Sequence, residues 1–286
     1  MVLSKKGEIV IKNYGLLGHP LSHSLSPQIH RRLFELCGDK FSTYELFDVD
    51  ISEMGRFFHG FNNLDGFNVT IPYKIDMYEK LMSLDQTAKR YGAVNTVKRL
   101  ENGLYRGYNT DIDGFLKSIE SEGISLCGEI LLLGFGGVGK MAAVETVSQK
   151  GSLTIALRNP SSPKVLKFMT DLLKIQKDAK IKIVNINKIP KINYDLLINA
   201  TPCGMFPNMS EIPVSFEICK KCSTIFDLIY NPTQTVLMKT GKMFGAKVVG
   251  GMAMLVWQAV FAHKIWNGSI YNENDIKNLI SDMKNR

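Results

Sequence analysis

The sequence predicts an α/β fold, and its second half predicts a doubly wound parallel sheet. From residue 129 onward, short apolar segments that read as strands alternate with helical or loop segments, which is typical of such sheets. The first of these strands runs directly into the turn Gly134-Phe-Gly-Gly-Val-Gly139, and the apolar spacing after it indicates a helix. The strands predicted for this sheet span residues 129–133, 152–157, 181–186, 195–199, 223–228 and 246–249.

The glycine-rich turn has the pattern of a dinucleotide-binding strand–turn–helix unit. Gly134 would permit the tight turn, Gly136 would let a pyrophosphate approach the backbone, and Gly139 would let the helix pack close to the strand. A P-loop shares most of this pattern, but it needs Ser or Thr directly after its lysine, where this chain has Met141. A glycine turn that binds no ligand is the remaining alternative.

Composition restricts the class of protein. The chain has 286 residues, 45% hydrophobic and 22% charged, which fits a globular protein of one large or two ordinary domains. No apolar run approaches a membrane span, and residues 1–7 lack the apolar core of a leader, so we expect a cytoplasmic protein without a membrane partner. Much of the +8 net charge comes from basic residues between 150 and 191. Many of them recur at helical spacing, as expected for a solvated helix face. Nucleic acid is not expected as a partner, because no reader motif is present.

The cysteines indicate neither a disulfide framework nor a metal site. There are five of them, scattered along the chain, and this odd number fits reduced thiols. Cys219-x-x-Cys222 is half of a zinc or redox motif, but no second pair or nearby histidine completes it. We therefore expect an incidental pair on a helix and no bound metal.

The first half of the chain begins with a strand that leads into a serine-rich helix start. Strands are predicted at residues 14–18, 43–47 and 66–71. Between the first two, Ser26 is a good N-cap, Pro27 suits the first helical position, and Gly38 closes the helix. Ser24 and Ser26 would place hydroxyls and amides together, which suits a carboxylate, although capping alone would also explain Ser26.

Two charged residues fall at positions that suit proton transfer. A helix is predicted over residues 72–82, so Lys74 falls in its first turn, where the helix dipole opposes a cation and favours release of its proton. A hairpin is predicted with its turn at Asn102-Gly103, and Asp111 ends its second strand, just before the helix predicted at 112–122. Polar residues at such a junction predict a site, although capping alone would also place an aspartate there.

Taken together, these segments resemble the shikimate dehydrogenases. The matching runs follow the family order at residues 22–27, 68–74, 92–96, 109–111, 133–137, 198–201 and 251–258. The resemblance implies NADPH-linked interconversion of 3-dehydroshikimate and shikimate in aromatic amino-acid biosynthesis. It also implies two domains, a substrate-binding α/β domain at 1–110 completed by C-terminal helices at 251–286, and a Rossmann-type NADP-binding domain at 111–250. A cleft between them would close on hinges near 111 and 250.

The resemblance also assigns roles to single residues. Lys74 and Asp111 would form the proton-transfer pair. Ser24, Ser26 and Tyr230 would bind the substrate carboxylate, and Thr70, Asn95 and Gln258 would hold the ring hydroxyls. The cofactor would be bound by Gly134, Gly136, Gly137, Val138, Gly139, Arg158, Asn159, Lys164, Thr201, Leu228, Gly251 and Met254.

The residues after the second strand of the parallel sheet favour NADP over NAD. An NAD enzyme has an acid there, about 20 residues after the glycines, to bind the ribose 2′-hydroxyl. This chain has Arg158-Asn159 instead, with Lys164 further along, and cations suit a 2′-phosphate. The family commonly has Asn-Arg-Thr followed by a second arginine, and Leu157 and Ser162 depart from that pattern.

Two other functions remain compatible with the sequence. One is a quinate/shikimate dehydrogenase that uses NAD or NADP, and the other is a non-catalytic NADP-binding sensor on the same fold. In every case the expected partner is a small molecule, and the chain is expected to act as a monomer or homodimer.

Overall fold

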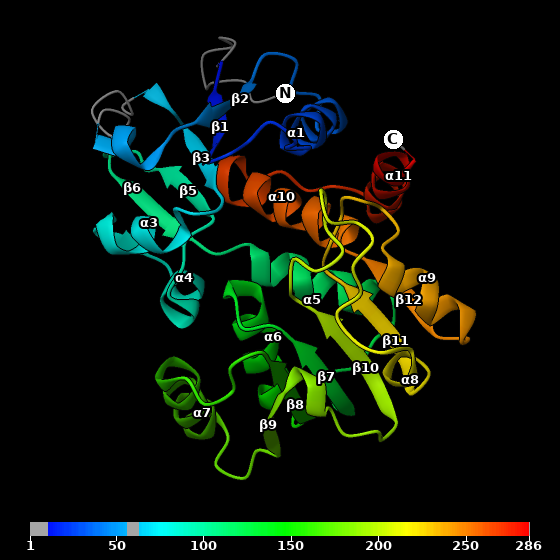
Figure 1. The fold of residues 1–286 in the computed structure, drawn as a ribbon. Helices are drawn as coiled ribbons and strands as arrows, with labels where there is room; N and C mark the ends of the chain where they lie inside the picture. Colours follow the sequence, from blue (N-terminus) through cyan, green and yellow to red (C-terminus); the bar gives the residue numbers. More distant parts are fainter. Residues whose placement is uncertain (1–10, 56–62, 286) are drawn as a thin grey trace. The chain divides into compact units, whose positions relative to one another are not determined.

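The computed structural model describes residues 11–55 and 63–285, and the chain forms two compact units (Figure 1). The first unit consists of Met1–Gly114 with Val256–Arg286, and the second of Phe115–Leu255. The sequence-based boundaries, 110/111 and 250/251, lie four and five residues from these limits. Residues 1–7, on which the expectation of an absent leader rests, lie outside the described residues. Within the described ranges, no helix is long and apolar enough to cross a membrane.

The first unit contains a mixed sheet with the strand order β2-β1-β3-β5-β6-β4. Its strands are β1 (Asn13–Gly18), β2 (Thr43–Asp48), β3 (Gly66–Val69), β4 (Ser83–Leu84), β5 (Thr96–Arg99) and β6 (Tyr105–Tyr108). Strands β2, β1 and β3 run parallel, whereas β5 is antiparallel to both β3 and β6. The predicted hairpin is confirmed, because Arg99 pairs with Tyr105 across the Asn102-Gly103 turn.

Two helices of the first unit start differently from what the sequence predicted. Its helical segments are α1 (Ser26–Leu36), η1 (Ile51–Glu53), α3 (Lys74–Lys80), α4 (Gln86–Tyr91) and α11 (Glu273–Lys284). Ser26 was the predicted N-cap of α1, but it is the first helical residue, and Leu25 precedes it without a side-chain cap. Pro72 lies in a turn before α3, because the Tyr73 N–H bonds back to the Thr70 carbonyl at 3.0 Å. Lys74 is therefore the first residue of its helix.

Two further helices each continue from one unit into the other. They are α5 (Asp111–Ser121) and α10 (Met252–Asn267). The end of α10 packs on the sheet of the first unit, where the Trp266 indole N–H donates to the Val97 carbonyl at 2.9 Å. The same indole stacks on Tyr14, with ring centroids 4.5 Å apart. Gly66 permits this approach, since a Cβ at that position would lie 2.5 Å from Trp266 Nε1. The C-terminal segment thus shares a core with the first strand.

The second unit contains a parallel sheet with the order β12-β11-β10-β7-β8-β9 (Figure 1). Its strands are β7 (Glu129–Leu133), β8 (Ser152–Leu157), β9 (Ile181–Asn185), β10 (Tyr194–Asn199), β11 (Cys222–Asp227) and β12 (Lys247–Gly250). Counted within this unit the order is 6-5-4-1-2-3, the doubly wound arrangement whose direction reverses between β7 and β10. The predicted α/β class is confirmed, and each predicted strand end lies within one residue of the observed one.

Helices and apolar side chains complete the second unit. Its helical segments are α6 (Gly137–Ser148), α7 (Pro163–Ile175), η3 (Ile186–Lys188), α8 (Phe216–Cys219) and α9 (Val236–Met243). Cys219 ends α8 and Cys222 begins β11, so the pair is not carried on one helix as predicted. Both thiols lie in the hydrophobic core, and burial raises their pKa values to about 11 and about 12. No metal-binding group of three or more His, Cys, Asp or Glu side chains occurs among the described residues.

We expect Gly66→Ala to lower the free energy of unfolding by about 1–3 kcal/mol, because its methyl group would collide with the Trp266 ring. Urea denaturation followed by tryptophan fluorescence measures this. Gly55→Ala is the control, since a Cβ there would meet no atom of the described residues within 4 Å, and it should change stability by less than about 0.5 kcal/mol. Equal stabilities of the two variants would contradict the packing of α10 on β3.

Candidate functional site

The first unit brings the predicted proton-transfer pair together. Lys74 is the first residue of α3, and Asp111 is the first residue of α5. The Lys74 ammonium donates to Asp111 Oδ2 at 2.6 Å, and the two side chains are 26% and 12% exposed. This partial burial strengthens the ion pair while leaving it open to a small molecule. An ammonium beside a carboxylate is the arrangement that general acid–base chemistry at a hydroxyl group needs.

Helix capping does not account for the Asp111 carboxylate. The N–H group of Asp111 is bound by Asn109 Oδ1 at 3.1 Å, so Asn109 supports the start of α5. The second carboxylate oxygen, Oδ1, accepts a hydrogen bond of 2.8 Å from Asn95 Nδ2. Both oxygens of Asp111 are therefore bound by the side chains of other predicted site residues.

Two of the three predicted hydroxyl-binding residues are connected to this pair by hydrogen bonds, and the third precedes Lys74 in the chain. Asn95 and Gln258 are both buried, and Asn95 Nδ2 lies 3.5 Å from Gln258 Oε1 on α10. Thr70 follows β3, four residues before Lys74. Its methyl group packs on Gly18, where an added Cβ would lie only 2.3 Å from it. Hydrogen bonds thus connect Lys74, Asp111, Asn95 and Gln258, and the backbone connects Thr70 to them.

The two predicted carboxylate-binding serines meet at the start of α1. The Ser26 N–H donates to Ser24 Oγ at 3.3 Å, so Ser24 covers one amide of the helix start. Ser26 itself is only 8% exposed and caps nothing. A side-chain hydrogen bond links Ser26 to Tyr44. Burial raises the pKa of Tyr44 well above its ordinary value, and the bond from Ser26 opposes that increase.

The glycine-rich turn of the second unit fits a dinucleotide. Gly134 has a φ of +98°, and a Cβ there would lie 2.9 Å from the Ala200 carbonyl oxygen. Gly139 packs against Gly134, where a Cβ would lie 2.8 Å from its carbonyl oxygen. In contrast, a Cβ on Gly136 or Gly137 would meet nothing within 4 Å, and α6 begins there without a side-chain cap. Open space in front of helix amides, Val138 included, is what a pyrophosphate requires.

The basic residues predicted to bind the 2′-phosphate are exposed after β8. Arg158 and Asn159 directly follow that strand, and Lys164 lies in the first turn of α7. The backbone of Arg158 is fixed, because its carbonyl accepts a hydrogen bond of 3.1 Å from Asn185 Nδ2. A guanidinium held at the end of the second strand, with no acid beside it in the sequence, suits a phosphate better than a ribose hydroxyl.

The remaining predicted residues of the second unit lie around the ends of β10 and β11. Thr201 donates its hydroxyl to Asn199 Oδ1 at 2.6 Å. Gly251 packs directly on the Leu228 backbone, where a Cβ would lie 2.1 Å from the carbonyl oxygen. Met254 is buried at the start of α10. Tyr230 follows β11, and burial raises the pKa of its hydroxyl. Tyr230 belongs to the second unit, whereas Ser24 and Ser26 belong to the first.

Two groups of buried polar residues were missed by the sequence analysis. In the second unit, Asp227 is fully buried and bonds Asn199 Nδ2 at 3.0 Å and Thr235 Oγ1 at 2.6 Å. Burial raises its pKa, and those hydrogen bonds oppose the increase. In the first unit, Asn68 and Tyr44 bond one another at 2.9 Å. Asn68 and Asp227 are polar residues within apolar strand segments, and buried polar side chains need hydrogen-bond partners. That pattern is the signal by which the sequence could have indicated both groups.

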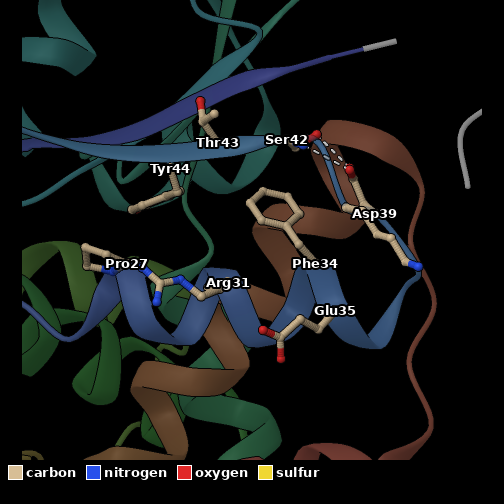
Figure 2. A pocket seen from close by; sticks show the side chains of 9 residues that line it. Pro27, Arg31, Phe34, Glu35, Asp39, Ser42, Thr43 and Tyr44 are labelled. Atoms are coloured by element: carbon tan, nitrogen blue, oxygen red, sulfur yellow. Dashed lines mark hydrogen bonds between the residues drawn. The ribbon is translucent and has the colours of Figure 1, made fainter. Parts of the chain in front are cut away.

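A pocket of about 510 Å³ lies between α1 and β2 in the first unit (Figure 2). Its lining includes Arg31, Glu35 and Asp39. Burial by itself raises the pKa of Asp39, but hydrogen bonds from the Ser42 side chain and from the Ser42 and Phe41 N–H groups lower it overall. None of the predicted site residues lines this pocket. It is therefore not the site of the predicted chemistry, although its wall includes Tyr44.

Comparison with known proteins identifies the family. A family model described as the shikimate dehydrogenase substrate binding domain matches residues 16–97. A shikimate dehydrogenase (NADP(+)) of Methanococcus maripaludis is 38% identical over 90% of this chain and 92% of its own length. The corresponding protein of Clostridium beijerinckii is 39% identical over 88% and 91%.

A solved structure extends this similarity to three dimensions. The crystal structure of shikimate 5-dehydrogenase from Thermus thermophilus, in complex with NADP(H) and shikimate, has a TM-score of 0.80 at 30% identity. The similarity covers 95% of this chain and 99% of that one. With relatives of this identity matched over nearly their whole length, the chain belongs to the shikimate dehydrogenase family.

Proposed function

We propose that the protein catalyses the NADP-dependent, reversible reduction of 3-dehydroshikimate to shikimate, a step of aromatic amino-acid biosynthesis. The observation that carries the proposal is the Lys74–Asp111 ion pair, which combines a proton donor and a hydrogen-bond acceptor in one partly exposed place. NADP-dependent shikimate dehydrogenases that align over more than nine-tenths of their length support the same conclusion.

Lys74 and Asp111 act on the oxygen of the substrate. During reduction the Lys74 ammonium donates a proton to the forming alkoxide, and during oxidation the neutral amine accepts it again. Asp111 bonds the same hydroxyl and orients the ammonium, which lies 2.6 Å from its Oδ2 atom. When bound, NADPH supplies the hydride that the ketone carbon receives.

Other residues of the first unit orient the substrate. Asn95 and Gln258, which share a hydrogen-bonding contact beside Asp111, bind the ring hydroxyls together with Thr70. The hydroxyls of Ser24 and Ser26 at the start of α1 bind the carboxylate, where the helix amides add a favourable field. Tyr230 of the second unit provides a further hydroxyl for that carboxylate.

The second unit binds the cofactor. The open turn at Gly136 and Gly137 receives the pyrophosphate, and Arg158 with Lys164 binds the 2′-phosphate. Asn159, Thr201, Leu228, Gly251 and Met254 contribute the rest of the cofactor surface. The proposal retains the cytoplasmic location and the monomeric or homodimeric state expected from sequence.

We expect Lys74→Ala and Asp111→Asn each to lower kcat for shikimate oxidation by about 10²–10⁴-fold, because each removes one member of the proton-transfer pair. Formation of reduced nicotinamide, followed by its absorbance with shikimate and NADP as substrates, measures the rate. Lys80→Ala, at the exposed end of the same helix, is the control and should retain wild-type kcat. Near-normal kcat in both site variants would contradict the assigned roles.

The same assay separates the alternative functions. Comparable kcat/KM values for quinate and shikimate would favour a quinate/shikimate dehydrogenase. NADP binding without turnover of either acid would favour a non-catalytic sensor.

Arg158→Ala should weaken NADP binding about 10–100-fold, because the charge-assisted hydrogen bonds to the 2′-phosphate are lost. NAD lacks that phosphate, so its affinity should change little. Calorimetric titration of both cofactors in the absence of substrate measures the two effects. Lys167→Ala, another exposed cation on α7, is the control. Equal weakening of NADP and NAD would show that Arg158 does not recognise the 2′-phosphate.

A further inference from the structure

A stack of aromatic and imidazole rings joins β2, α1 and α10 in the first unit. The ring of Tyr44, on the edge strand β2, stacks on His30 of α1 with centroids 3.9 Å apart and planes inclined by 9°. His30 Nδ1 lies 2.9 Å from His263 Nε2 on α10, and His263 Nδ1 lies 2.6 Å from the Tyr271 hydroxyl. Three segments distant in the sequence therefore hold the Tyr44 ring in one position.

The stack is electrically neutral. Both imidazoles are fully buried. Burial lowers the pKa of His30 well below its ordinary value, with a smaller effect from His263, and burial lowers the pKa of His263 to about 3. A neutral imidazole pair brings no charge near Asp111 at physiological pH, so the stack acts by packing and hydrogen bonding. Figure 2 shows Tyr44 and Phe34 between β2 and α1.

Tyr44 fixes the orientation of Asn68. The Asn68 amide nitrogen donates to the Asn95 backbone carbonyl at 3.1 Å, and a carbonyl can only accept. Asn68 Oδ1 must therefore face the other way, toward the Tyr44 hydroxyl, which donates to it at 2.9 Å. Without that hydroxyl, the buried amide oxygen would lose the hydrogen bond from Tyr44 and keep only the contact with the His30 ring, which favours a different side-chain position.

The orientation of Asn68 continues to Asp111 through Thr96 and Asn95. The Asn68 amide nitrogen also donates to Thr96 Oγ1 at 3.0 Å, so the Thr96 hydroxyl is free to donate to Asn95 Oδ1 at 3.1 Å. The Thr110 backbone N–H donates to the same Asn95 oxygen at 2.7 Å. Two donors on Oδ1 turn the Asn95 nitrogen toward Asp111, which accepts at 2.8 Å. The Thr110 hydroxyl belongs to the same network, because it lies 2.9 Å from Thr96 Oγ1 and 3.1 Å from Asn95 Oδ1, so either threonine hydroxyl can supply the second donor to Asn95.

We propose that Tyr44 is a positioning residue for the reaction: its hydroxyl orients Asn68 and, through Thr96 and Asn95, holds the Asp111 carboxylate in line with Lys74. This inference rests on the proposed function, because it assigns Tyr44 to the proton-transfer pair of that reaction. Tyr44 touches neither Lys74 nor Asp111 directly, and it acts only through the side chains between them.

The test compares Tyr44→Phe with Tyr105→Phe. Both tyrosines are half-buried in the first unit, and the Tyr105 hydroxyl donates to the Leu64 carbonyl at 2.9 Å, so each change removes one buried hydroxyl and the hydrogen bond that it donates. Tyr44→Phe also removes the bond to Ser26, so KM for shikimate is measured together with kcat. Phenylalanine at position 44 keeps the stack on His30. Steady-state oxidation of shikimate by NADP is measured in H₂O and in D₂O, with NADP affinity from titration and the unfolding temperature of each protein.

Tyr44→Phe is expected to lower kcat on the order of tenfold, because misplacement of a reacting group slows the chemical step. The solvent isotope effect on kcat should rise, since proton transfer becomes more rate-limiting, while the NADP dissociation constant stays within about twofold. Tyr105→Phe should leave all three quantities unchanged. A merely structural role for Tyr44 would lower the unfolding temperature without changing the isotope effect, and that result would overturn the proposal.

A second variant tests the next residue of the series. Thr96→Val removes the hydroxyl that links Asn68 to Asn95 but keeps the shape of the side chain, and it should reproduce the lower kcat and the higher isotope effect. If Tyr44→Phe and Thr96→Val both match wild type, the positioning role is wrong although the proposed function stands. If wild-type protein does not oxidise shikimate with NADP, the proposed function itself fails.

Discussion

The hydrogen-bonded ion pair between Lys74 and Asp111 is the constraint on which the first unit depends. A carboxylate that is 12% exposed has lost most of its water, so its charge must be balanced by protein groups. Lys74 supplies the opposite charge and Asn95 supplies a second hydrogen bond. Lys74 begins α3, Asn95 precedes β5 and Asp111 begins α5. The contacts that balance the charge of Asp111 therefore also join three parts of the fold.

Backbone groups explain how such a small polar site keeps one arrangement. An asparagine amide can rotate end for end at little cost when its neighbours can both donate and accept. Here the Asn95 carbonyl fixes Asn68, and the Thr110 N–H fixes Asn95. The Thr96 and Thr110 hydroxyls complete the network between them, and either of these two can donate to the other. A buried polar network whose members are all paired is rigid, and rigidity is what a proton-transfer pair requires.

The second unit solves a different problem, which is to leave a surface open for a large anionic ligand. The sheet order reverses between β7 and β10, so the helices that follow these strands diverge and leave a crevice at their carboxyl ends. Glycines at 134 and 139 bring the turn and helix close, whereas those at 136 and 137 face open space. Asp227, Asn199 and Thr235 tie the neighbouring strand ends together from the buried side.

The sequence by itself determined the α/β class, the strands of the parallel sheet and the hairpin, because apolar periodicity and turn glycines are local properties. It also singled out Lys74 and Asp111, through a helix start and a strand end. Only the tertiary structure decided that Ser26 lies inside its helix, that Pro72 precedes α3, and that the Tyr44 hydroxyl bonds Asn68. The last of these depends on hydrogen bonds between distant segments, which are 24 residues apart for Tyr44 and Asn68 and 233 for His30 and His263. No local pattern specifies such partners, since each polar residue could equally bind water until packing excludes it.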